Sequence, residues 1–359
     1  MTVPILMKEV LSLTKAGRLA DATALLKQSL PGSGFEQMPA GSAPAAAAGE
    51  LPLLPLTGTA KPKDAAYSAR TQASPEGFAR QSYAGPEGRI AYRLFVPGGL
   101  TGPAPLIVML HGCTQNPEDF ARGTGMNDLA TELGFIVAYP EQTAAANPQK
   151  CWNWFRPGDQ ERGRGEPALL AALTRQIIAA HPVDGSRVYV AGLSAGGAAA
   201  SIMAHAYPDL YAAVGIHSGL ACGSAKDVPS AFSAMKGGNG NRATRIAEVY
   251  VPTITFHGDR DQTVHPSNSE AILATGTANP KVAGFERRTT KGRSAGGRDY
   301  RRTVLVDADG RNWIEHWEIL GGGHSWSGGD AGGSYTDPSG PEASRAIVEF
   351  FLQHRLAAN

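Results

Sequence analysis

A serine between two glycines has the clearest potential for chemistry in this chain. Residues 192–196 read GLSAG; they follow the predicted strand Arg187–Ala191 and open an alanine-rich stretch. At a strand-to-helix turn, this G-x-S-x-G pattern exposes the serine hydroxyl at a helix N-terminus, and the glycines let strand and helix approach closely. The pattern predicts Ser194 as the nucleophile of an acyl transfer. The alternative is a glycine-rich turn without chemistry.

A nucleophilic serine needs a histidine base and an acid to orient it. The segment 257–264, HGDRDQTV, follows the apolar run Val251–Phe256 and offers Asp259 and Asp261. We prefer Asp261 because it lies farther out in the loop. The base is predicted at His324, in the glycine-rich segment GGGHSW, whereas His316 lies within a predicted strand and is the more ordinary histidine.

Backbone N–H groups must also stabilise the oxyanion that forms during acyl transfer. One donor is expected from Ala195, the residue after the nucleophile. The other is expected from the loop after the apolar run Leu106–Leu110, where LHGCT offers Cys113 or Thr114. A simple strand-ending turn is the alternative interpretation of this loop.

The order serine, aspartate, histidine is that of the α/β-hydrolase fold, and each residue follows a predicted strand. Short apolar runs alternate with helical patterns, which predicts a mostly parallel central sheet with helices on both faces. The strands are predicted at Ile90–Val96, Leu106–Leu110, Phe135–Tyr139, Val188–Ala191, Ala213–His217, Val251–Phe256 and Trp313–Leu320, with helices at Pro167–Ala180 and Ala195–Ala206.

Composition divides the chain into three regions. Apolar residues at helical spacing, interrupted at Ala16-Gly17-Arg18, predict a helical hairpin over residues 1–30. An Ala/Pro/Gly-rich linker is predicted over 31–77, followed by the catalytic domain over 78–359. The hairpin is expected to pack on the catalytic domain or on a partner.

The same composition excludes several classes of protein. The 359 residues have a formal net charge of +1, without the basic excess of a nucleic-acid-binding protein. No apolar run approaches the roughly 20 residues of a membrane-spanning helix. We recognise no signal peptide, which makes the default location cytoplasmic. The predicted chemistry needs no cofactor or metal, and the three cysteines lack zinc-ligand spacing. The absence of a signal peptide is inferred from four charged residues that interrupt the apolar stretch a signal peptide would need: Lys8, Lys15, Arg18 and Asp21.

The chain resembles the esterases of the polyhydroxybutyrate depolymerase family. The resemblance implies the triad Ser194, Asp261 and His324, and an oxyanion hole at Cys113 and Ala195. It also allows a secreted, extracellular location. The matching segments are HGCTQN (111–116), YPEQ (139–142), CWNWF (151–155), GLSAGG (192–197), HSGL (217–220), HGDRDQTV (257–264), GGGHSWSGG (321–329) and the leader-like LTKAGRLADATALL (13–26).

The resemblance also implies that CWNWF lines the substrate cleft. Trp152 and Trp154 would present flat apolar faces to a hydroxyalkanoate chain or an aromatic acid, with core packing as the alternative for each. Thr114 and Trp326, beside the oxyanion loop and His324, are assigned to substrate contact as well.

A disulfide is expected between two of the three cysteines. Cys113 lies in the oxyanion loop, and Cys151 opens the segment that should overhang the same cleft; Cys222 is left outside the bond. Such a bond would hold a backbone donor in place. Three reduced thiols are the alternative, since disulfides are rare in the cytosol.

The favoured function is a serine carboxylesterase acting through an acyl-enzyme on polyhydroxyalkanoate or hydroxybutyrate polyester or oligomers. Feruloyl, acetylxylan or other small esters are the alternative substrates. A peptidase or acyltransferase on the same fold is one rival. A catalytically silent binding protein is the rival of another class, although neither nucleophile nor base is lost.

Overall fold

The structure is a computed structural model that describes residues 77–238 and 249–357. The predicted hairpin over 1–30, and all of the predicted linker except its last residue, lie outside the described residues.

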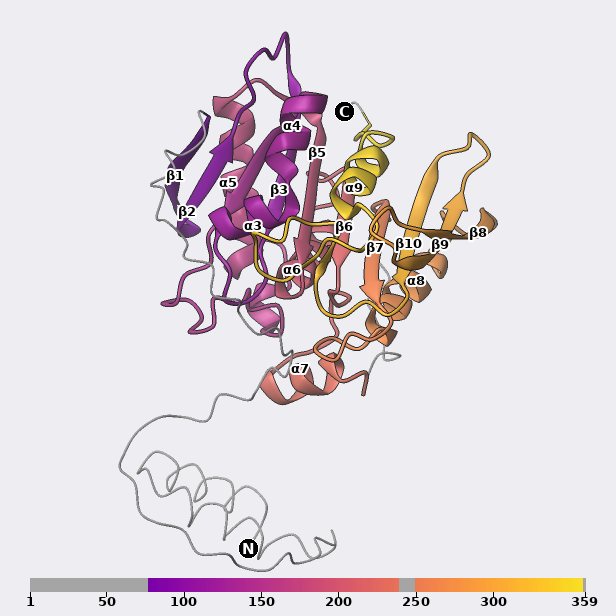
Figure 1. Ribbon diagram of the computed structural model, residues 1–359. Helices are drawn as coiled ribbons and strands as arrows, with labels where there is room; N and C mark the ends of the chain where they lie inside the picture. Colours follow the sequence, from indigo (N-terminus) through magenta and orange to yellow (C-terminus); the bar gives the residue numbers. More distant parts are fainter. Residues whose placement is uncertain (1–76, 239–248, 358–359) are drawn as a thin grey trace, which may run out of the picture. The chain divides into compact units, whose positions relative to one another are not determined.

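One ten-stranded sheet organises the described residues, in the order β1-β2-β4-β3-β5-β6-β7-β10-β9-β8 (Figure 1). The six strands from β4 to β10 pair in parallel, whereas the two strands at each edge join in antiparallel fashion. The strands are β1 Phe78–Gly85, β2 Gly88–Phe95, β3 Ala104–Leu110, β4 Ile136–Pro140, β5 Val183–Leu193, β6 Ala213–His217, β7 Thr253–Gly258, β8 Glu286–Arg293, β9 Asp299–Val306 and β10 Asn312–Ile319.

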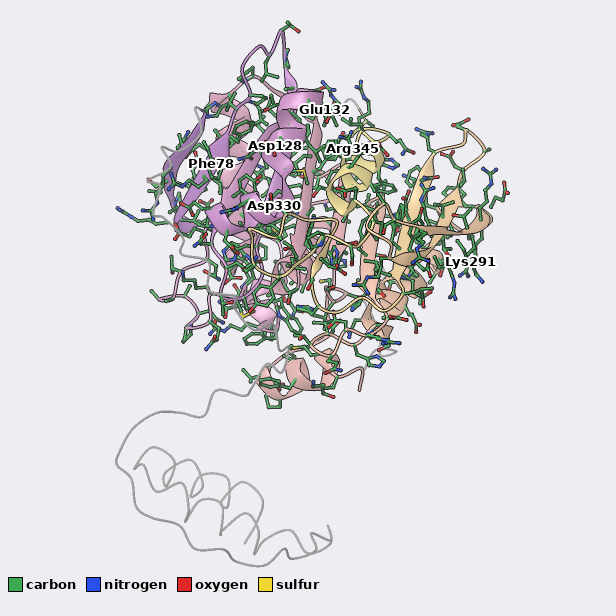
Figure 2. The ribbon with its side chains drawn as sticks, viewed as in Figure 1. Phe78, Asp128, Glu132, Lys291, Asp330 and Arg345 are labelled. Carbon is green, nitrogen blue, oxygen red and sulfur yellow. A yellow bond between two sulfur atoms is a disulfide. The ribbon has the colours of Figure 1, made fainter. Side chains whose placement is uncertain are left out.

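Helices cover both faces of this sheet, so every residue of β3, β4, β6 and β7 is buried. One apolar core lies beneath α5 (Gly165–Ala180), α6 (Ala195–Ala206), α7 (Val228–Met235) and α8 (Ser267–Thr277). A second lies beneath α3 (Pro117–Thr124), α4 (Met126–Leu133) and α9 (Ala343–Phe351). A salt bridge of 2.7 Å from Arg345 to Glu132 joins α9 to α4 (Figure 2).

The predicted sheet with helices on both faces is confirmed, but three of its ten strands, β1, β8 and β9, were missed. β8, with the sequence ERRTTKGR, is exposed along most of its length because it is an edge strand. It therefore lacks the apolar alternation on which strand prediction depends. In β1, only Phe78 and Tyr83 are buried. None of the described helices is long and apolar enough to cross a bilayer.

Candidate active site

The turn between β5 and α6 holds Ser194 in a backbone conformation that is rare for a side-chain-bearing residue. Its φ is 58° and its ψ is −118°. The backbone N–H of Ser194 donates to the carbonyl oxygen of His217, 2.9 Å away, at the end of the neighbouring strand β6. The side chain is half-buried at the mouth of this turn. This is the geometry of a nucleophile elbow.

The two glycines flanking Ser194 allow three pieces of backbone to meet. A methyl group on Gly192 or on Gly196 would overlap the carbonyl oxygen of Leu110, at the end of β3. A methyl group on Gly192 would also overlap the backbone of Gly196. Only glycine at both positions lets β5, α6 and the end of β3 come this close, which brings Ser194 beside the loop that follows β3.

Asp261 and His324 meet at the same sheet edge, on the loops after β7 and β10. His324 Nδ1 lies 2.6 Å from Asp261 Oδ2, and the Asp261 side chain is fully buried. Asp261 Oδ1 accepts the backbone N–H groups of Thr263 and Val264, each at 2.9 Å. Since a carboxylate only accepts, Nδ1 of His324 carries the proton and its Nε2 is left as the basic nitrogen.

The neighbouring carboxylate, Asp259, has a different role. It is exposed, and its Oδ1 accepts the backbone N–H of Gly321 at 2.6 Å. It thereby supports the start of the glycine-rich loop that carries His324. The structure brings Asp261, and not Asp259, into contact with the imidazole of His324.

The Asp261 carboxyl group is held in its ionised form. Burial by itself would raise its pKa, but hydrogen bonding to the imidazoles of His257 and His324 outweighs burial and holds the pKa well below the usual range. An ionised carboxylate at this position can stabilise the imidazolium that forms when His324 takes a proton.

His257 is a residue of the site that sequence reasoning passed over. Its Nε2 donates to the carbonyl oxygen of Val264 at 2.8 Å and lies 3.4 Å from Asp261 Oδ2. Its Nδ1 is buried and has no hydrogen-bond partner among the described residues. Because a carbonyl oxygen and a carboxylate only accept, Nε2 of His257 carries a proton. His257 and His324 thus both approach Oδ2 of Asp261.

His217 ties the nucleophile turn to the His324 loop. Its carbonyl oxygen accepts the N–H of Ser194, and its Nε2 accepts the N–H of Ser327 at 3.0 Å. The ring stacks on Phe256 and Trp326, with centroids 5.6 and 5.0 Å away. Complete burial holds the pKa of His217 well below its usual range, so the ring stays a neutral acceptor. The HSGL segment marked this residue, but only the fold reveals its partners.

The loop after β3 leaves the N–H group of Cys113 available for an oxyanion. The N–H of Gly112 donates to Gln115 Oε1 at 2.9 Å, and that of Thr114 donates to the carbonyl oxygen of Gln149 at 2.7 Å. Within the described residues, the N–H groups of Cys113 and Ala195 have no protein acceptor. The sequence left Cys113 and Thr114 as alternative donors, and of these two only Cys113 has a backbone N–H group without an acceptor.

A disulfide joins Cys113 to Cys151, whose Cα atoms are 4.2 Å apart. It fastens the loop after β3 to the segment before Trp152. Cys222 is buried and lies outside this bond.

The expected substrate contacts of three tryptophans need correction. Trp152 and Trp326 are each only 1% exposed, and Trp154 is 7% exposed. The indole N–H of Trp152 donates to the carbonyl oxygen of His111, and that of Trp326 donates to Ser344 Oγ. All three rings belong to the apolar cores, so they cannot present a face to a substrate. Thr114, by contrast, is exposed within the loop after β3.

A buried polar network supports the segment that carries Trp152. Both oxygens of Glu166 accept hydrogen bonds, from Gln142 Nε2 at 2.6 Å and from the side chain and backbone of Asn153 at 2.6 and 2.8 Å. Burial and the nearby Asp159 raise the pKa of Glu166 to about 7. No cluster of three or more His, Cys, Asp or Glu side chains suited to a metal ion occurs in the described parts of the chain.

The parallel sheet, with its serine turn after β5 and its Asp–His pair after β7 and β10, has the α/β-hydrolase fold. A solved acetyl xylan esterase from Aspergillus awamori has this architecture in common with the chain. The likeness covers 77% of the chain and 99% of that structure, with a TM-score of 0.59 at 19% identity.

Residues 90–302 match the family described as esterase PHB depolymerase, and the chain belongs to that family. A poly(3-hydroxyalkanoate) depolymerase C from Paucimonas lemoignei is 33% identical over 64% of the chain and 56% of its own length. A feruloyl esterase B from Thermothelomyces thermophilus is 34% identical over 38% of the chain and 47% of its own length. The chain thus spans about half the length of these curated relatives.

Proposed function

We propose that the chain is a serine carboxylesterase that cleaves ester bonds through an acyl-enzyme on Ser194. The observation that carries the proposal is the buried 2.6 Å contact between Asp261 and His324, at the sheet edge where the strained serine turn lies. Membership of the esterase PHB depolymerase family supports the same reaction.

In the proposed first step, His324 Nε2 removes the proton of Ser194 Oγ as that oxygen attacks the ester carbonyl carbon. Asp261 holds the imidazole in the required tautomer and stabilises its positive charge. The N–H groups of Cys113 and Ala195 stabilise the tetrahedral oxyanion, a contribution worth about 3–4 kcal/mol per donor. The C–O bond to the alcohol then breaks, and the alcohol leaves with the proton from His324.

In the second step, water attacks the acyl-enzyme while His324 takes one of its protons. Collapse of the second tetrahedral species releases the acid and returns the proton to Ser194. The nucleophile, the base, the acid and both oxyanion donors of this cycle belong to the chain.

The favoured substrate class is a polyester or oligomer of hydroxyalkanoate units. A relative named for that activity matches 64% of the chain, whereas the feruloyl esterase relative matches 38%. Ferulate esters and acetylated xylan are the competing substrates, since relatives named for both activities also match.

The test is the rate of hydrolysis of hydroxybutyrate oligomers, methyl ferulate, acetylated xylan and an amide analogue by the wild type and two variants. Ser194→Ala should lose about three or more decades of ester hydrolysis without unfolding, because glycines build the turn. Ser186→Ala, near the opposite end of β5, is the matched control and should keep its rate. A Ser194→Ala rate within about tenfold of wild type would refute the nucleophile. Preferential cleavage of the amide would indicate a peptidase.

A further inference from the structure

The five non-glycine residues with positive φ in the described part of the chain lie around the candidate site. Such conformations persist only where the surrounding structure enforces them, and they are concentrated at functional positions. One is the nucleophile, one follows His217, and one precedes the disulfide. The remaining two contact each other and have no role in the chemistry above. The five non-glycine residues are Thr114 (66°), Lys150 (52°), Ser194 (58°), Ser218 (48°) and Tyr335 (53°).

Tyr335 lies between the two loops that border the proposed cleft. Its carbonyl oxygen accepts the N–H of Trp326 at 2.6 Å, two residues beyond His324. Its hydroxyl lies 3.2 Å from Thr114 Oγ1, in the residue after the oxyanion donor Cys113. The side chain is nonetheless open to solvent, with 36% of the residue exposed. Tyr335 is thus fastened to both loops and still accessible.

The hydrogen bonds around Thr114 leave Tyr335 with an unused acceptor. Thr114 Oγ1 lies 2.6 Å from the carbonyl oxygen of Cys113, which can only accept, so Thr114 donates its hydroxyl proton there. Thr114 Oγ1 can then only accept from Tyr335, whose hydroxyl proton is committed to that bond. The phenolic oxygen therefore retains a free acceptor lone pair.

We propose that Tyr335, oriented by Thr114, is a hydroxyl-binding subsite that accepts a hydrogen bond from a hydroxyl group of the ester substrate. The inference rests on the proposed function, since it requires an ester held at Ser194. The hydroxyl can belong to the acyl half, as in a 3-hydroxyacyl unit, or to the alcohol half. A plain alkyl or acyl chain offers no such donor.

Paired esters that differ by one hydroxyl test the subsite. The acyl pair is 4-nitrophenyl 3-hydroxybutyrate and 4-nitrophenyl butyrate; the alcohol pair is 2-hydroxyethyl butyrate and ethyl butyrate. The readout is the ratio of kcat/KM within each pair. Tyr335→Phe should lower the ratio in one pair by about three- to tenfold, the effect of one neutral hydrogen bond. The pair that responds identifies the half of the substrate that carries the hydroxyl.

Thr114 provides a second test that leaves the tyrosine in place. Thr114→Val keeps the side-chain shape but removes the acceptor that orients Tyr335, so the same ratio should fall. Thr114→Ser keeps the hydroxyl and should preserve the ratio. Tyr300→Phe, on β9 near the sheet edge, is the matched control and should change neither ratio. Thermal unfolding of each variant verifies that it is folded.

Unchanged ratios in both pairs for Tyr335→Phe, or a fall equal to that of Tyr300→Phe, would overturn the subsite. If hydrolysis still depended on Ser194 in that case, the esterase proposal would stand and only the subsite would fail. Wild-type protein that cleaves none of the four esters would overturn both.

Discussion

Removing the disulfide should cost the protein both stability and rate. The bond between Cys113 and Cys151 closes a loop with a sequence separation of 38 residues. For a loop of that length, the entropy of the unfolded chain gives a stabilisation of about 4 kcal/mol at 25 °C. Cys151→Ser should therefore lower the free energy of unfolding by about that amount, as measured by guanidinium titration.

In Cys151→Ser, kcat should fall by less than the loss caused by removing an oxyanion donor altogether, which is about 100- to 1000-fold. Two hydrogen bonds, from the N–H of Gly112 to Gln115 and from that of Thr114 to Gln149, still hold the loop when the disulfide is absent. We expect kcat to fall about tenfold, because the loop is loosened and not lost.

A reductant supplies the control for this experiment. By breaking the disulfide, it should lower the free energy of unfolding of the wild type to that of Cys151→Ser. It should leave the free energy of unfolding of Cys151→Ser unchanged. The reasoning fails if Cys151→Ser unfolds within about 1 kcal/mol of the wild type, or if the reductant destabilises both proteins equally.

Three other changes have equally definite outcomes. Asp261→Asn should reduce kcat far more than Asp259→Asn, because only Asp261 contacts the base; equal losses would contradict this. Since folded Glu166 keeps its proton up to about pH 7 but releases it near 4.5 when unfolded, the free energy of unfolding should fall as pH rises across that interval. Glu166→Gln should flatten this slope in denaturant titrations, whereas Glu161→Gln should retain it. Trp152→Ala should lose about 3–5 kcal/mol of stability and slow small and bulky esters in proportion; selective loss of bulky esters would restore a substrate role.

Local sequence patterns predicted the central strands of the sheet and the helix that packs on them. Helix α6 spans Ala195–Ala206 and strand β6 spans Ala213–His217, the same ranges that the sequence indicated. Both are apolar, and a serine marks one end of each: Ser194 precedes α6 and Ser218 follows β6. The edge strand β8 has no buried face, and its pairing with β9 is determined only by the completed sheet.

The same distinction between local patterns and distant contacts applies to the residues of the site. Ser194 and His324 lie in glycine-rich segments whose spacing has a chemical meaning. His257 and His217 lie at strand ends, and their roles depend on contacts that sequence spacing does not encode, such as the bond from Ser327 across 110 residues. The tryptophan assignments were wrong because CWNWF lies among polar and glycine-rich residues, while its burial is set by partners such as His111, 41 residues away.

The position of His324 after β10 also determines when the proposed esterase activity can first appear while the ribosome synthesises the chain. The contact between Asp261 and His324 spans 63 residues, and His324 follows β10, which pairs with β7 in the interior of the sheet. At translation rates of about 5–20 residues per second, the ribosome adds those 63 residues in roughly 3–13 seconds. Throughout that interval the nascent chain carries the serine turn and its acid without a base. By the proposed mechanism, hydrolysis therefore requires β10 and His324, and a nascent chain that ends before His324 cannot cleave an ester in this way.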